Sequence, residues 1–197
     1  MFKCLIDRRI AEVFALVLYR ILKMASSFQI DPSVSDLTQM EFRDLLQPAF
    51  VFEKKNSNLY GNAGNGKTHL AQAIGLEACK QDKVVRFFRT AALVNRLSEA
   101  QKKSELNAFM KTLMKADLII CDEWGYVPLD RDGSKLLFQV ISECYEQRSV
   151  IITTNLEFSK WVHIFYDEQM TSAMIDLLVH HSHCFCSKAK ALESGIG

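Results

Sequence analysis

The fold is decided by the stretch Gly61-Asn62-Ala63-Gly64-Asn65-Gly66-Lys67-Thr68. It fits the phosphate-binding loop pattern G-x-x-x-x-G-K-[ST] at every fixed position. Glycine allows φ above zero and lets the backbone approach a phosphate without a Cβ in the way. The N–H groups of the loop and of the helix that it opens then face the anion. The pattern predicts that residues 61–69, His69 included, bind nucleotide phosphates; the alternative is a Gly/Asn-rich turn before a helix.

Apolar segments alternate along the chain with segments of helical periodicity. Strands are expected at 57–60, 84–88, 118–121, 150–154 and 183–186, and helices at 67–80, 90–101, 104–115, 133–147 and 168–181. We expect Thr90 and Ser104 to cap the second and third of these helices. The alternation predicts an α/β fold with a parallel sheet of about five strands, covered by helices on both faces. Together with the loop, it predicts a three-layer P-loop NTPase.

The strand that leads into the loop has an unusual composition. Ser57 and Asn58 stand where a buried parallel strand normally has Val or Ile. The sequence therefore predicts a poor strand directly before Gly61.

Polar residues fall just past the ends of three predicted strands, where parallel sheets bind ligands. In the loop, Lys67 is expected to reach the β and γ phosphates of ATP, and the Thr68 hydroxyl to hold Mg²⁺. Asp122 is expected to bind the same Mg²⁺, and Glu123 to polarise the attacking water as general base. Asn155 is expected to orient that water. The alternatives are an acid pair that caps a strand and a plain turn asparagine.

The composition is that of an ordinary soluble domain with a short extension. The chain has 197 residues, of which 49% are hydrophobic and 24% charged, with a formal net charge of +1. So small a net charge gives no overall nucleic-acid signature. Residues 80–115, however, hold nine Lys or Arg and three Asp or Glu. This segment predicts one face that contacts an anion; a solvated helix surface is the alternative.

Three parts are expected along the chain: a helical extension with a connector at 1–34, an ATPase domain at 35–186 and a disordered tail at 187–197. The helix expected at 8–25 is apolar on several faces, so it must pack against the domain or a second protein. Its apolar run at 13–19 is too short to cross a bilayer, which predicts no membrane partner. The six cysteines form no C-x-x-C pair. We therefore expect free thiols, buried at Cys79, Cys121 and Cys144, and a cytoplasmic protein.

Two other patterns have a functional and a structural interpretation. One is a cluster of metal-ligating residue types: His180, His181, His183, Cys184 and Cys186. Structural zinc sites normally pair two separated clusters, so we predict no metal there. The other pattern is aromatic: Trp124, Tyr126 and Trp161. Such rings stack on bases in some proteins, but more often they pack beside the sheet, and we predict packing.

Four segments carry a resemblance to a known family: residues 61–71, 86–92, 121–130 and 151–161. Over about residues 35–183 the chain resembles the IstB family, the AAA+ ATPase helpers of insertion-sequence transposition, which are similar to the DnaC helicase loaders. The resemblance implies an AAA+ fold, MgATP as cofactor, and a homo-oligomer with ATP at its subunit interfaces. It also implies assembly on DNA and a partner transposase. The segment 90–115 then faces DNA, with Lys102 and Lys103 as sequence-independent phosphate contacts.

The chain departs from the family pattern at three places. The family usually reads Asp-Arg-Leu where this chain reads Asp176-Leu177-Leu178, and that arginine resembles the finger that reaches the ATP of a neighbouring subunit. The family continues past His183 in a different way, which resembles a frameshift or truncation here. Residues 1–30 are short and apolar for DNA contacts. These features suggest a degenerate copy and leave two alternatives open: an ATP-binding assembly module with weak or no hydrolysis, and a DnaC-like helicase loader.

Overall fold

The computed structural model describes residues 49–187, with residues 65 and 181 excepted. Its centre is one parallel sheet of five strands in the order β2-β3-β4-β1-β5. The strands are β1 (Asn56–Gly61), β2 (Val85–Arg89), β3 (Leu118–Asp122), β4 (Ser149–Thr154) and β5 (Ser182–Ser187). All neighbouring strands pair in parallel. The predicted α/β fold is therefore confirmed, and β5 is the edge strand expected at 183–186.

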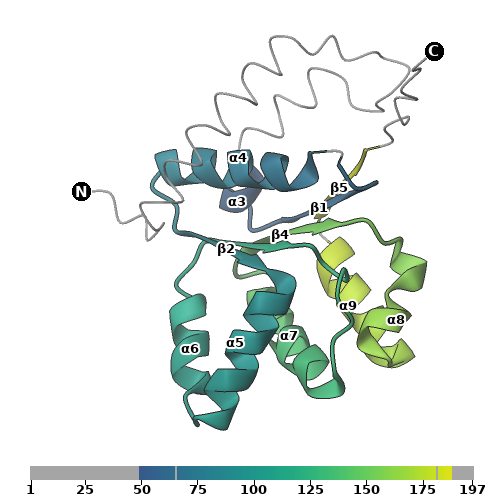
Figure 1. Ribbon diagram of the computed structural model, residues 1–197. Helices are drawn as coiled ribbons and strands as arrows, with labels where there is room; N and C mark the ends of the chain where they lie inside the picture. Colours follow the sequence, from purple (N-terminus) through teal and green to yellow (C-terminus); the bar gives the residue numbers. More distant parts are fainter. Residues whose placement is uncertain (1–48, 65, 181, 188–197) are drawn as a thin grey trace, which may run out of the picture.

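Helices cover both faces of the sheet (Figure 1). On one face lie α3 (Ala49–Phe52) and α4 (Lys67–Lys80), and on the other lie α5 (Thr90–Lys102), α6 (Leu106–Leu113), α7 (Arg131–Cys144), α8 (Val162–Phe165) and α9 (Glu168–Val179), with a 3₁₀ turn, η1, at Phe158–Lys160. The core is accordingly split into two apolar clusters, a small one under α4 and a large one under α5 to α9. Such a three-layer arrangement is what buries strands on both faces.

Two predicted helix caps are wrong. Thr90 is the first residue of α5, whose N-cap position is Arg89, and the Thr90 hydroxyl donates to the backbone carbonyl of Asp122 over 2.9 Å. Ser104 has φ 58° and ends α5. The N–H groups of Ser104 and Glu105 donate to helix carbonyls at residues 101 and 100, as in a Schellman motif. A residue in this conformation cannot adopt the extended backbone of an N-cap.

Aspartates cap two of the predicted helices. Asp130 accepts from the backbone N–H of Gly133 over 2.7 Å, which sets the start of α7 two residues earlier than expected. Asp167 accepts from the N–H of Met170 over 2.6 Å at the start of α9. Both caps satisfy N–H groups that have no partner within the helix.

The polar residues of β1 close the carboxyl end of α9. Asn56 donates through Nδ2 to the carbonyl of Leu177 and Asn58 to that of Leu178, each over 3.1 Å. These carbonyls lie in the last turn of α9, where no intrahelical donor remains. Asn56 also accepts from the N–H of Val150 on β4 over 3.0 Å. The strand predicted to be poor is thus a well-paired central strand, and its asparagines serve the neighbouring helix.

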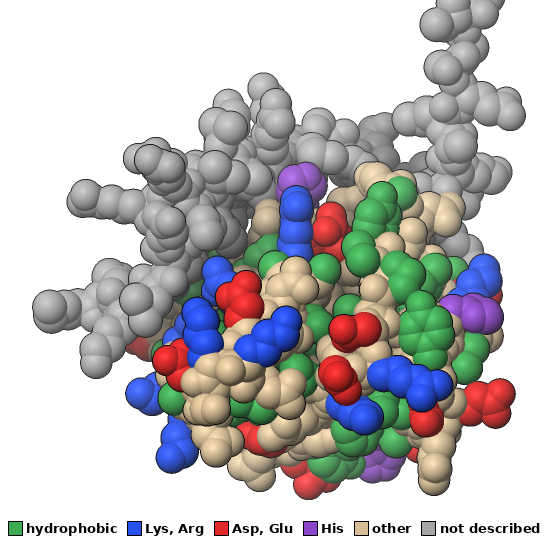
Figure 2. Space-filling model, turned by 60° about the horizontal axis from the view of Figure 1, so that its bottom comes forward, with side chains coloured by type: hydrophobic (Ala, Val, Ile, Leu, Met, Phe, Trp, Pro, Cys, Tyr) green, Lys and Arg blue, Asp and Glu red, His purple; other side chains and the backbone are tan. Residues whose placement is uncertain are grey.

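The basic segment 80–115 runs through β2, α5 and α6. Lys102 and Lys103 are exposed at the turn between α5 and α6. Figure 2 views the molecule from the side on which these helices lie, and Lys and Arg side chains there are interspersed with Asp and Glu. This side of the molecule therefore carries no single broad basic patch.

Several predictions concern residues that the structure does not describe. These are the helix at 8–25, the connector, the first residues of the ATPase domain expected from 35, and the tail from residue 188. Within the described residues no helix is long and apolar enough to cross a membrane. Cys79, Cys121 and Cys144 are buried, as expected. Burial raises the pKa of the Cys144 thiol to about 12, so this thiol stays protonated.

Candidate nucleotide-binding site

The predicted phosphate loop joins the carboxyl end of β1 to α4. Gly64 and Gly66 have φ of 83° and 74°, a left-handed conformation that favours glycine. Gly66 is the N-cap position of α4, and no side chain caps this helix. Helices α7 and α9, in contrast, have their aspartate caps. The first N–H groups of α4 are therefore available to an anion, as the loop pattern requires.

Lys67 lies in the first turn of α4 and folds over the loop. Its ammonium donates to the carbonyls of Gly61 and Asn62, 2.7 Å each. Burial lowers the pKa of Lys67 from its usual value, and the negative charge of Asp122 partly opposes that shift. Among the other predicted loop residues, four are exposed: Asn62, Ala63, Gly64 and His69. Asn65 lies outside the described residues.

Asp122 ends β3 and is the most constrained polar group of the site. It is only 2% exposed. Its Oδ1 accepts from the Thr68 hydroxyl over 2.8 Å and from the Thr153 hydroxyl over 2.5 Å. The predicted pair of Thr68 and Asp122 is thus in direct contact, 54 residues apart in sequence.

Glu123 follows the strand with a left-handed backbone, φ 58°. Its N–H donates to the Thr153 hydroxyl over 3.0 Å. Its side chain extends away from the sheet at the carboxyl edge. That side chain is exposed, and Oε2 lies 3.5 Å from Nε of Arg89 at the end of β2. A non-glycine residue with positive φ directly after a strand stores strain of about 1–3 kcal/mol, and such strain concentrates at functional sites.

Asn155 follows β4 directly and is exposed. Strand β4 lies between β3 and β1, so Asn155 belongs to the same edge as Asp122 and Gly61. All the described residues predicted for the site therefore gather at one edge of the sheet. Contact among them is limited to Thr68 with Asp122 and Lys67 with Gly61 and Asn62.

A buried aromatic layer supports the segment after Glu123. Trp124 and Trp161 are fully buried, and their ring centroids lie 5.4 Å apart. The prediction that these two rings pack beside the sheet is confirmed. Tyr126, in contrast, is 70% exposed, and the prediction is wrong for this residue. Gly125, between Trp124 and Tyr126, has φ 75°. This conformation turns the chain out of the aromatic layer and brings Tyr126 to the surface.

The donor set of the site suits Mg²⁺. This ion prefers oxygen ligands and is usually held by one or two protein oxygens together with substrate phosphates. Thr68 and Asp122 supply a hydroxyl and a carboxylate that already touch each other. The residues present therefore fit the predicted ion.

The alternative metal site at the C-terminal histidines has no support from the described residues. No group of three His, Cys, Asp or Glu side chains gathers among them. His180 instead has Nδ1 3.1 Å from the Tyr145 hydroxyl. His181 and the side chains of His183, Cys184 and Cys186 are outside the description.

Sequence reasoning missed two residues that position the acids, Thr153 and Thr90. Thr153 bridges the carboxylate of Asp122 and the N–H of Glu123, and Thr90 donates to the carbonyl of Asp122. A signal for Thr153 was present, because a hydroxyl residue follows Val150, Ile151 and Ile152 in a fully buried strand. A buried hydroxyl needs a partner, and the carboxyl edge supplies one.

The parallel five-stranded sheet and the phosphate loop define the fold as that of P-loop NTPases of AAA+ type. Solved structures share this fold. A DnaC helicase loader superposes with a TM-score of 0.63 and 24% identity, over 77% of this chain and 92% of that chain. A replication initiator DnaA bound to AMPPCP and single-stranded DNA gives 0.66 and 18%, over 84% and 50%. Identities this low establish the fold alone.

The chain belongs to the family described as IstB-like ATP-binding proteins, whose profile matches residues 6–193. An ATP-binding protein of insertion sequence IS232 from Bacillus thuringiensis subsp. berliner is 35% identical over 79% of this chain. That of IS5376 from Geobacillus stearothermophilus is 37% identical over 83%. The chain spans 61% and 64% of the length of these two relatives. The match extends beyond residues 35–183, into two of the three departures: residues 1–30 and the chain past His183.

Proposed function

We propose that the protein is a Mg²⁺-dependent ATPase that assembles on DNA and assists a transposase. The observation that carries this proposal is the contact between Thr68 and Asp122 behind an uncapped helix start. A phosphate loop and an acidic strand end that touch in this way form the usual site for MgATP. The family consists of ATP-binding proteins, which supports ATP as the ligand.

Each residue of the edge has a distinct role in this proposal. The α4 N–H groups and Lys67 bind the phosphates, and Thr68 and Asp122 hold Mg²⁺, which when bound neutralises charge on the β and γ oxygens. Glu123 accepts a proton from the attacking water, because its side chain is exposed at the edge. Asn155 donates to or accepts from that water and so orients it. Thr153 fixes both acids through one hydroxyl.

The position of Leu177 supports a second candidate, an ATP-binding assembly module with little turnover. The Leu177 carbonyl is bound by Asn56, the first residue of β1, whereas the loop starts at Gly61. At about 3.3 Å per strand residue these points are about 16 Å apart. An arginine at 177 would therefore be too far from its own nucleotide, as expected of a residue that serves a neighbouring subunit. The Leu177 side chain is uncharged, so it cannot act as such a finger, and it packs partly against the core.

DNA and a transposase are the proposed partners. Lys102 and Lys103 are exposed at the α5–α6 turn and are suited to sequence-independent phosphate contacts. The relatives are proteins of insertion sequences, which favours a transposase over a replicative helicase. A pull-down from cells that contain both would decide this, and capture of the helicase would favour the DnaC-like alternative.

The test of the first candidate measures ATP binding and hydrolysis on one sample, with and without Mg²⁺ and DNA. We expect Lys67→Ala to abolish binding, and Glu123→Gln to keep binding and abolish turnover. Failure of wild-type ATP binding would overturn the proposal.

The two candidates are separated by position 177. If wild type binds ATP without turnover, Leu177→Arg should raise hydrolysis strongly, because such a finger is worth about 10³–10⁵ in rate in other systems. Leu177→Gln controls for the lost packing. If Leu177→Arg leaves turnover at background, the finger is not what limits it.

A further inference from the structure

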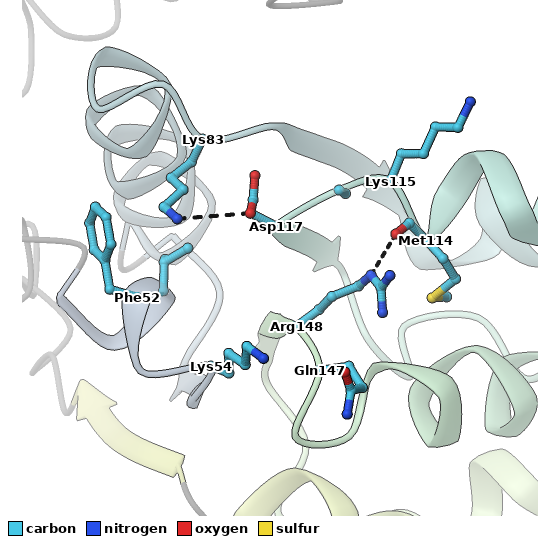
Figure 3. A pocket seen from close by; sticks show the side chains of 10 residues that line it. Phe52, Lys54, Lys83, Met114, Lys115, Asp117, Gln147 and Arg148 are labelled. Carbon is cyan, nitrogen blue, oxygen red and sulfur yellow. Dashed lines mark hydrogen bonds and ion pairs between the residues drawn. The ribbon is translucent and has the colours of Figure 1, made fainter.

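A pocket of about 200 Å³ lies at the amino edge of the sheet, opposite the phosphate loop. It is formed by the chain around α3, the start of β2, the end of α6 and the turn before β4 (Figure 3). Its main side chains are Phe52, Lys54, Lys83, Lys115, Asp117 and Arg148. The site proposed for ATP uses none of these residues.

The pocket is strongly basic. Four cations line it against a single carboxylate, Asp117. That carboxylate is already engaged, since its Oδ2 accepts from the Val84 N–H over 2.8 Å. Its Oδ1 lies 3.9 Å from the Lys83 ammonium. The three remaining cations, Lys54, Lys115 and Arg148, have no ion pair with any residue in the described part of the chain.

Arg148 is held in place by the fold. Its Nε donates to the carbonyl of Met114 over 2.6 Å, at the carboxyl end of α6, where a cation is favourable. Arg148 lines the pocket (Figure 3), and its other two guanidinium nitrogens make no hydrogen bond within the described part of the chain. A guanidinium fixed in this way presents a planar pair of donors, the geometry that matches a phosphate. Helix capping accounts for Nε but leaves these donors, and the ammonium of Lys54, without a structural task.

Phe52 adds an aromatic wall. The Lys83 ammonium lies 4.3 Å from the centre of its ring, and the side chain is still 53% exposed. An exposed aromatic ring beside several cations is typical of grooves that bind nucleic-acid strands. In such grooves bases stack on the rings, and the cations contact the phosphate backbone.

The pocket lies at the opposite end of α6 from the basic turn between α5 and α6. Lys103 lies before α6 and Lys115 directly after it. The eight residues of α6 span about 12 Å at 1.5 Å per residue. A strand that contacts the turn is therefore able to reach the pocket by following α6 over about 12 Å.

We propose that this pocket binds a phosphate of a nucleic-acid strand and extends the DNA contact from the α5–α6 turn to the amino edge of the sheet. This inference rests on the DNA binding in the proposed function. It places the nucleic acid and the nucleotide at opposite edges of one sheet, so that both bind at once.

The test uses the full chain and fluorescently labelled DNA of mixed sequence, duplex and single-stranded, in a salt titration between about 50 and 200 mM. The test variant is Lys54→Gln/Lys115→Gln, because both side chains are exposed and have no partner that folding requires. The control is Arg131→Gln/Lys135→Gln, which removes the same charge from exposed positions of α7. Thermal melting checks that both variants fold.

For duplex DNA, we expect the slope of log K against log[salt] to be less negative by about 1–2 in the test variant, because each phosphate contact contributes about −0.9. The control should keep the wild-type slope. Phe52→Ala should weaken single-stranded DNA more than duplex, by about tenfold, since stacking is worth about 1–3 kcal/mol per base.

Three results would overturn the inference. Equal slopes for the test and control variants would mean that the pocket does not contact DNA. The proposed function would stand if Lys102→Gln/Lys103→Gln still changed the slope. A wild-type chain that binds no DNA would overturn both proposals. Loss of ATP binding in the test variant, with unchanged DNA binding, would assign the pocket to a nucleotide phosphate instead.

Discussion

Left-handed backbone occurs at both edges of the sheet, for different reasons. At the amino edge Asp82, with φ 59°, follows α4, and the N–H groups of Asp82 and Lys83 donate to the carbonyls of Cys79 and Ala78. This is the ordinary way to end a helix. At the carboxyl edge Glu123 has the same φ, 58°, but it follows a strand, and no helix end is closed by it.

The comparison separates two uses of polar groups in one fold. At the amino edge they satisfy the ends of helices, as Asn56 and Asn58 do for α9. At the carboxyl edge α4 starts without a side-chain cap, and strain at Glu123 is held by the Thr153 hydroxyl. The contrast lies in the helix ends: side chains of the sheet close the end of α9, whereas the start of α4 is left open, which favours the carboxyl edge for the nucleotide.

The largest effect is expected for Gly125→Ala. A Cβ at this position would clash with Ile164 and lie 2.9 Å from Leu156 Cδ1, in addition to the strain of φ 75°. Strain of about 1–2 kcal/mol and overpacking of about 1–3 kcal/mol together predict a loss of about 3 kcal/mol in the free energy of unfolding. Chemical denaturation measures it.

The matched control for this strain is Gly64→Ala. Gly64 has φ 83° and nothing within 4 Å of an added Cβ, so only the backbone strain of about 1 kcal/mol is expected. Equal losses at Gly64 and Gly125 would mean that Ile164 and Leu156 shift to make room for the added methyl group.

The next effect concerns the hydroxyl of Thr153. Thr153→Val keeps the shape of the side chain but leaves the N–H of Glu123 and one lone pair of Asp122 without their partner. We expect a loss of about 2 kcal/mol in stability, because a buried group left unsatisfied costs about 1–3 kcal/mol. We also expect a rise in the Mg²⁺ concentration needed for ATP binding, measured by titration.

Thr154→Val separates these two effects. The Thr154 hydroxyl donates to the carbonyl of Trp124 over 2.9 Å and touches neither acid. The control should therefore lose stability to a similar degree and keep the Mg²⁺ dependence of wild type. A shifted Mg²⁺ requirement in both variants would show that Thr153 has no special role.

Patterns of apolar periodicity and the loop motif were enough to predict the fold and the edge at which the candidate residues gather. The strands ending at Gly61 and Asp122 lie where their sequence indicates, since buried parallel strands and glycine-rich loops have few alternatives. What failed were assignments to single side chains. Serine is a residue type that often caps helix starts, but the backbone of Ser104 closes the carboxyl end of α5.

Tertiary contacts explain the remaining differences. Asn58 weakens the strand pattern in isolation, and only the position of α9 shows what its amide donates to. Thr153 has a partner 31 residues away, across a strand pairing that no local pattern contains. Such long-range hydrogen bonds decide which polar residues a buried strand tolerates.

A third prediction concerns pH and the charge of Lys67. Burial lowers the pKa of Lys67, whereas a bound phosphate raises it, so the complex keeps a proton that the free protein loses as the pH rises. The affinity for ATP should therefore fall with rising pH above the pKa of the free protein, by up to about tenfold per pH unit. Isothermal titration between about pH 7 and pH 10 measures this.

Lys67→Arg is the control for this pH dependence. The guanidinium stays charged throughout that range, so whatever affinity the variant has should not change with pH. A flat profile for wild type would show that Lys67 stays fully charged beside Asp122, and that the charge of the carboxylate outweighs the burial of the ammonium.

The smallest effect tests the amino edge, with two neighbouring residues of β1. Asn58→Leu is close in shape but leaves the carbonyl of Leu178 without its donor, and we expect a loss of about 1 kcal/mol in the free energy of unfolding. Ser57 is equally buried, but its hydroxyl has no partner among the described residues. Ser57→Ala should therefore be neutral or slightly stabilising, because it removes a polar group that burial disfavours. Equal melting temperatures for the two variants would mean that the end of α9 needs no donor from the sheet, and the contrast between the two edges would then rest on the loop alone.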